Sequence, residues 1–343
     1  MTANTLVFHE ANLGSTPIRD LGLTIAGTRL EPILAEFEDE LRRAGLTRVR
    51  PRFYLSTEWG VPFETVAIAI PFYLARPDLT ELHAERVGHV EGFNRTDILR
   101  YLRHEMGHVV GYAYRLYESE EWVRHFGAIT QPYVEEYRPE PFSRRYVRHL
   151  PGWYAQKHPD EDWAETFAVW MTPGLDWRAE YGGWPVALAK LLYCDRTMAA
   201  LRERDPLVTD DEPDEDVGEL DYSLEHYYET ARPGDGELPP GLDGALRAIF
   251  EDLAEMGDES PRAPHRSAGE LIRRLERELM ANIFRWTGHF PERTRVLLRQ
   301  LAERATALNL GYPAEREPTA VVGLTTFVTG LAMNHVYKGT YLP

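Results

Sequence analysis

Two histidines stand four residues apart, with a glutamate directly after the first, in the run His104-Glu105-Met106-Gly107-His108. Apolar residues recur at helical spacing from about Asp97 to Tyr117, so the run is predicted to lie on a helix. Residues four apart on a helix project from one face, and both imidazoles could therefore bind one metal ion. Glu105 would lie beside that metal without binding it, where it can accept a proton from a metal-bound water. This spacing is typical of zinc hydrolases.

A catalytic zinc needs a third protein ligand. One extension of the motif would place a histidine six residues after His108, but Tyr114 occupies that position. A second predicted helix, starting near Pro159, carries Glu161 and Glu165 one turn apart. A buried carboxylate is costly unless it is paired or binds a metal, so one glutamate could bind the metal while the other supports a metal-bound histidine. The residues alone leave His158, Glu161 and Glu165 open as the third ligand.

Together the two segments resemble the gluzincin zinc peptidases, in particular bacterial zinc-binding metallopeptidases and the group with the anthrax lethal factor catalytic domain. In that group a tyrosine is followed, after six residues, by Glu-x-x-Ala-Glu-x-Phe. Here Tyr154 precedes Glu161-Asp162-Trp163-Ala164-Glu165-Thr166-Phe167 at that spacing. The resemblance implies Glu161 as the zinc ligand, Glu165 as a supporting carboxylate and Tyr154 as the hydroxyl that steadies the oxyanion. The specific match covers about Thr96 to Met171 and leaves the C-terminal third unmatched.

Two parts of this interpretation have alternatives. A phenol beside the zinc would stabilise the negative oxygen of the tetrahedral intermediate, but Tyr154 could equally be a packing residue. The resemblance also implies that an extended substrate pairs with an edge strand, here Thr65 to Ile70, although a core strand is an equal alternative. Five tryptophans surround the second segment, and we expect most in the core and one or two in a subsite. They are Trp153, Trp163, Trp170, Trp177 and Trp184.

The expected fold class is α+β: a zincin-like domain over residues 1–204, with a small mixed sheet and the active-site helix. A helix from Thr28 to Gly45 and strands at Arg52–Ser56 and Thr65–Leu74 precede that helix. Pro71 cannot donate to a sheet, so the second strand should end near it or lie at an edge. An acidic run suggests a linker over 205–240, and an all-helical module is expected over 241–343. Its elements are predicted at Leu242–Met256, Ala268–Trp286, Glu292–Leu310 and, as helix or strand, Ala320–Val336.

Composition excludes some functions. The formal net charge of −17 argues against a nucleic-acid partner, which would need a basic face. The single cysteine, Cys194, excludes an internal disulfide and lies in an apolar run typical of a core. The N-terminus lacks the features of a signal peptide, and no membrane-spanning run is expected. We therefore expect a cytoplasmic protein, although an effector exported without a cleaved signal would have the same features.

These observations predict a zinc-dependent peptidase in which His104, His108 and Glu161 hold Zn²⁺ and Glu105 acts as general base. Its partner would be a peptide or protein substrate, and the C-terminal module could dock a second protein. One alternative is a zinc hydrolase acting on another amide. Another is a zincin-derived binding or scaffold protein with structural zinc, against which the intact Glu105 argues, because a structural site has no use for a general base.

Overall fold

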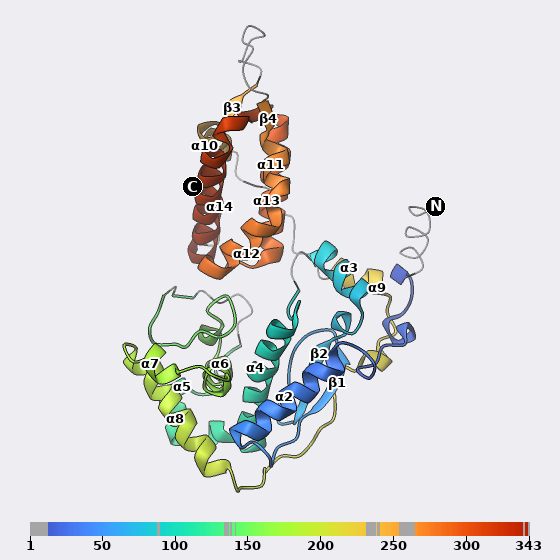
Figure 1. Ribbon diagram of the computed structural model, residues 1–343, viewed down its shortest axis with the longest axis vertical. Coiled ribbons are helices and arrows are strands. Elements are labelled where there is room, and N and C mark those ends of the chain that lie inside the picture. Colours follow the sequence, from blue (N-terminus) through green and yellow to red (C-terminus); the bar gives the residue numbers. More distant parts are fainter. Residues whose placement is uncertain are drawn as a thin grey trace. The chain divides into compact units, whose positions relative to one another are not determined.

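The computed structural model describes residues 13–87, 90–133, 137, 139–140, 142–230, 238, 241–253, 265–338 and 340–341. The chain divides into two compact units, Met1–Ala231 and Arg232–Pro343, which are described separately (Figure 1). Both combine helices with a small sheet, so the α+β class is confirmed at that level. The zincin likeness remains a prediction.

The first unit contains a two-stranded parallel sheet of β1 (Arg52–Ser56) and β2 (Ala67–Pro71). Gly60 forms an isolated antiparallel bridge with Ala69 on β2. The expected mixed sheet therefore consists of one parallel strand pair and this single antiparallel bridge. Every residue of β2 is buried, and the strand ends at Pro71, as the missing N–H of proline predicts. Helix α2 (Leu30–Ala44) buries an apolar face in the same core, including the fully buried Phe37.

Helices α4 (Arg95–Ala113) and α6 (Pro159–Met171) pack against each other at the centre of this unit (Figure 1). Asn94 caps α4 by accepting a hydrogen bond from the backbone of Asp97. The helices touch backbone to backbone, because a Cβ added to Gly107 would lie 2.7 Å from Ala164 Cα. The remaining elements of the unit are η1 (Ile18–Leu21), η2 (Phe72–Leu74), α3 (Pro77–Val87), η3 (Leu116–Glu118), α5 (Glu120–Phe126), η4 (Tyr154–Gln156), α7 (Trp177–Glu180), α8 (Pro185–Leu201), η5 (Val217–Glu219) and α9 (Leu224–Thr230).

The acidic stretch expected as a linker over 205–240 belongs to the first unit as far as residue 230. The backbone N–H of Val66 donates to Asp210 O at 2.6 Å, and the Tyr54 hydroxyl donates to Asp214 at 2.7 Å. Leu224 is fully buried in the core of this unit. Because these bonds and this burial hold the stretch against the unit, the boundary lies at residue 231 instead of 204. Residues 231–237 and 239–240 lie outside the described part.

The second unit is not all-helical. Its helices are α10 (Leu242–Ile249), α11 (Ala268–Arg274), α12 (Glu276–Thr287), α13 (Pro291–Ala307) and α14 (Glu317–Lys338), with η6 (Ala314–Arg316). A three-stranded antiparallel sheet, β3-β5-β4, accompanies them: β3 (Glu251–Asp252), β4 (His265–Ser267) and β5 (Leu310–Pro313). The helix predicted to reach Leu310 stops earlier because Asn309 adopts a positive φ of 50°, which a helix does not accommodate. A Cβ on Gly311 would lie 2.8 Å from Arg266 O, so glycine at this position permits β5 to pair with β4.

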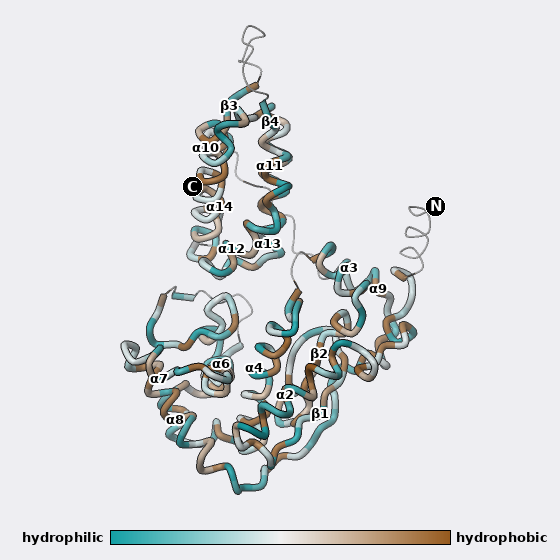
Figure 2. The backbone as a smooth tube through the Cα atoms, in the orientation of Figure 1, coloured by the Kyte–Doolittle hydropathy of each residue, from teal (hydrophilic) through white to brown (hydrophobic). Residues whose placement is uncertain are grey.

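The helical stretch Ala314–Tyr337 is long and apolar enough to cross a membrane by length and composition, contrary to the expectation that no such run exists. Figure 2 shows few hydrophilic positions along α14. Leu324, Val328 and Leu331 on this helix are fully buried in the core of the second unit. Over the apolar window as a whole, however, only 28% is buried, so burial in this core covers one side of the helix.

Candidate metal centre

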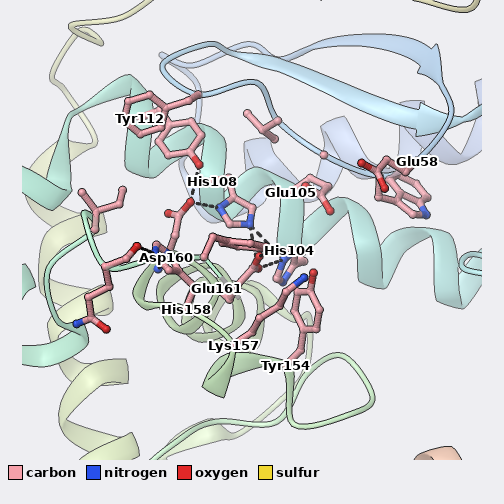
Figure 3. A pocket seen from close by; sticks show the side chains of 17 residues that line it. Glu58, His104, Glu105, His108, Tyr112, Tyr154, Lys157, His158, Asp160 and Glu161 are labelled. Atoms are coloured by element: carbon pink, nitrogen blue, oxygen red, sulfur yellow. Dashed lines mark hydrogen bonds and ion pairs between the residues drawn. The ribbon is translucent and has the colours of Figure 1, made fainter. Parts of the chain in front are cut away.

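Helix α4 places His104, Glu105 and His108 side by side in the first unit, and all three are buried (Figure 3). Helix α6 brings Glu161 to them from the opposite side. Glu161 Oε2 lies 3.0 Å from His104 Nε2 and 3.3 Å from His108 Nε2, and the two Nε2 atoms lie 3.2 Å apart. Among the described residues, these three form a group that could hold a metal ion, with one ligand atom from each within 4.8 Å of the others.

The other candidates for the third ligand have different contacts. Glu165 is fully buried and accepts hydrogen bonds from the backbone of His149 and Leu150 while its Oε1 lies 3.0 Å from His104 Nδ1. It therefore contacts the ring nitrogen of His104 that faces away from the group. His158 is the N-cap of α6: its Nδ1 accepts from the backbone of Asp160, and its Nε2 lies 3.0 Å from Gln131 O. Neither residue belongs to the group.

Further polar residues, which the sequence motifs do not include, lie behind the histidines. Asp160 Oδ2 lies 3.1 Å from His108 Nδ1 and accepts a 2.5 Å hydrogen bond from the Tyr112 hydroxyl. Each histidine thus has a carboxylate at Nδ1, which would hold the proton on Nδ1 when Nε2 binds a metal. Tyr112 lies one helical turn beyond His108, and Asp160 directly precedes Glu161, so both stand at positions that the motif spacing could have indicated.

The charges of the cluster shift its pKa values in opposite directions. Although burial lowers it, the neighbouring carboxylates of Glu161 and Glu165 raise the pKa of His104 to about 9. Burial alone would raise the pKa of Glu161, yet the two histidines hold it well below its usual range. Burial raises the pKa of Glu105, against the effect of both histidines. Glu161 is therefore ionised, as a metal ligand must be, and Glu105 is a stronger base than an exposed glutamate.

Two tyrosines lie beside the cluster. The ring of Tyr154 packs edge-on against His104, with centroids 5.5 Å apart, and the Tyr133 hydroxyl donates to Glu161 Oε1 at 2.6 Å. Burial, Glu161 and the adjacent Tyr133 raise the pKa of Tyr154 well above its ordinary value, so its hydroxyl stays protonated and can donate. Lys157 Nζ lies 4.4 Å from the Tyr133 ring and 5.3 Å from the Tyr154 ring.

These residues line a cavity of about 470 Å³. Figure 3 shows Glu58 on the side of His104 away from Asp160 and Tyr112. Residues of β2 do not line the cavity, so the strand expected to receive substrate is a core strand, separated from it by the segment of Gly60. The lining residues are Glu58, Trp59, Gly60, Val61, Phe63, His104, Glu105, His108, Tyr112, Ile129, Gln131, Tyr133, Tyr154, Lys157, His158, Asp160 and Glu161.

None of the five tryptophans predicted around the second segment lines this cavity, whereas Trp59 does. Trp163 is fully buried, and Trp153 and Trp177 are buried as well, which confirms the core role for most of them. Trp59 stacks on Tyr101 with centroids 5.4 Å apart. The segment after β1 therefore contributes Trp59 and Phe63 to the cavity lining, in addition to Tyr112, Tyr133 and Tyr154.

Comparison with known proteins finds no matching family model, no matching curated protein and no matching solved structure. The likeness to gluzincins consequently rests on the residues of α4, α6 and Tyr154 alone.

Proposed function

We propose that this protein is a zinc-dependent peptidase. The observation that carries the proposal is a buried group of His104, His108 and Glu161 with Glu105 beside it, all lining one cavity. Two imidazoles and one carboxylate are a donor set typical of catalytic zinc, and a set of three leaves a coordination position for water. An ionised Glu161 and the carboxylates behind both histidines fit a divalent cation at this point.

Each residue has a distinct role in the proposed reaction. Bound zinc would polarise the substrate carbonyl and lower the pKa of water. Glu105 accepts the proton of the attacking water and delivers it to the leaving amine. Burial raises the pKa of Glu105, which makes it a better proton acceptor. Tyr154, kept protonated, donates to the oxygen that becomes negative. Glu165 and Asp160 hold the rings of His104 and His108 in place.

Backbone geometry near the cavity favours a peptide substrate over a small amide. The backbone N–H of Ala69 donates to Gly60 O at 2.8 Å, so Gly60 is the bridge between β2 and the cavity lining. Trp59 and Val61, on either side of Gly60, also line the cavity, so this segment forms the edge of the cavity that is bonded to β2. We propose that an extended substrate pairs with this edge. The implied substrate strand thus moves from Thr65–Ile70 to the segment around Gly60.

Metal analysis and peptide cleavage test the proposal together. The purified protein should contain about one zinc per chain and cleave members of an unbiased peptide library, and Glu105→Gln should keep the zinc while losing cleavage. Zinc without cleavage of any peptide would favour a different amide substrate or a scaffold role. Absence of stoichiometric zinc with both histidines intact would refute the metal centre itself.

A further inference from the structure

The two carboxylate oxygens of Glu161 face different partners. Oε2 lies toward the Nε2 atoms of His104 and His108, while Oε1 accepts the hydrogen bond from Tyr133. We infer that Tyr133 is a positioning residue that restricts Glu161 to binding the metal through one oxygen. This inference rests on the proposed metal centre and adds a residue that no part of the sequence motif contains.

The position of Tyr133 is determined by the start of α6, the helix that carries Glu161. Since His158 Nδ1 accepts from the backbone of Asp160, its Nε2 carries the proton and donates to Gln131 O at 3.0 Å. This bond connects Gln131, two residues before Tyr133 in the segment after α5, to the N-terminus of α6. The Tyr133 ring then packs on His158, with centroids 5.3 Å apart, beneath Lys157 Nζ.

The hydroxyl of Tyr133 points into the cluster although the residue is exposed. Tyr133 is 48% exposed, yet its hydroxyl is directed into the cluster and ends 2.6 Å from Glu161. A hydrogen bond to a charged acceptor at this distance is stronger than one between neutral groups. Packing alone does not require this arrangement, because a phenylalanine would make the same ring contacts with His158 and Lys157.

Restricting Glu161 to one oxygen has a chemical consequence. A carboxylate with both oxygens available can occupy two coordination positions, and the second of these is the position that the attacking water needs. With Oε1 bound to Tyr133, only Oε2 would be available to the metal. The hydroxyl also fixes the rotation of the carboxylate, so less conformational freedom is lost when the metal binds.

The test is Tyr133→Phe, which removes the hydroxyl and keeps the ring. Zinc affinity is measured by competition with a chromophoric chelator, and coordination number is followed by the visible absorption of the cobalt-substituted protein. We expect affinity to fall about tenfold to a hundredfold, the usual effect of removing a bond to a metal ligand, together with a changed cobalt spectrum. Circular dichroism checks that the fold is retained.

Tyr137→Phe is the matched control, because the Tyr137 hydroxyl donates to Gly152 O at 2.5 Å and not to a proposed ligand. It should bind zinc as the wild type does. Zinc affinity within twofold of wild type and an unchanged cobalt spectrum in Tyr133→Phe would overturn the inference. Equal losses in both variants would also overturn it, since they would indicate general loosening of the segment. A wild-type protein that binds no zinc would instead refute the proposed metal centre, and this inference with it.

Discussion

Gly107→Ala should separate the two helices that form the proposed metal centre. Gly107 lies between the proposed ligands His104 and His108 on α4, and its backbone faces Ala164 on α6. The added Cβ would lie 2.7 Å from Ala164 Cα and 3.0 Å from Ala164 O. Both are backbone atoms, which cannot rotate away as the end of a side chain can, so the helices themselves must move.

The expected effect is the difference between two opposing contributions. Overpacking a close contact destabilises a protein by about 1–3 kcal/mol, and alanine gains about 1 kcal/mol over glycine inside a helix. The net destabilisation is therefore about 0–2 kcal/mol, or up to roughly 8 °C in the unfolding midpoint for a unit of this size. Movement of α6 also carries Glu161 away from both histidines. Zinc affinity should consequently fall by about tenfold or more, as for other changes that displace a metal ligand.

Thermal unfolding by circular dichroism and zinc competition measure the two effects on the same protein. Gly330→Ala is the control, because Gly330 lies within α14 and a Cβ there meets nothing within 4 Å. That variant should be slightly stabilised and should bind zinc normally. If Gly107→Ala has wild-type stability and wild-type zinc affinity, the close approach of α4 and α6 does not determine the geometry of the site.

Glu161→Ala should weaken zinc binding more than Glu165→Ala, although Glu165→Ala should lower stability more, since it leaves buried donors unpaired; the reverse order of zinc affinities would assign Glu165 as the ligand. Chelation should lower the unfolding midpoint of the zinc-loaded protein in calorimetry, because zinc binds only the folded site; an unchanged midpoint would contradict this. Burial, with the charges of His335 and Arg293, lowers the pKa of His289 to about 3. The stabilisation from neutral His289 is complete above pH 6.5 and is lost as pH falls toward 3, by about 4–5 kcal/mol at most. Urea unfolding between pH 7 and pH 4 should therefore show a steeper decline in the free energy of unfolding for the wild type than for His289→Gln. Parallel pH profiles of the two proteins would refute this expectation.

Local patterns predicted the helices of the candidate site because the relevant information is local. The spacing of His104 and His108 implies one helix face, and Pro159 with the acidic residues after it is typical of a helix start. The pairing of Glu161 with these histidines was inferred from a resemblance, since no helical period relates residues 57 apart. The structure brings the two segments together through the contact of Gly107 with Ala164, two small residues that a single sequence does not mark as partners.

The errors in the fold arose where tertiary contacts outweigh composition. The acidic run after Arg204 has the composition of a solvated linker, yet its backbone pairs with Val66 and its Asp214 accepts from Tyr54. Short strands in the second unit were missed for a similar reason. Strands as short as Glu251–Asp252 contain too few residues for alternation to be visible, and their pairing depends on Gly311, which is distant in sequence.

The residues that sequence reasoning missed at the site share one property. Asp160 and Tyr133 contact a proposed ligand, and Tyr112 donates to Asp160, so no rule of metal coordination specifies their spacing. Asp160 and Tyr112 could nevertheless have been predicted from the sequence, because each lies on a helix already predicted to carry a ligand, close to that ligand in the sequence. Tyr133 could not have been predicted in this way, because it lies on an irregular segment that the bond from His158 to Gln131 holds beside Glu161. Its proposed role therefore depends on the capping of α6. His158, first considered as the third ligand, would then help to position Glu161, the proposed third ligand.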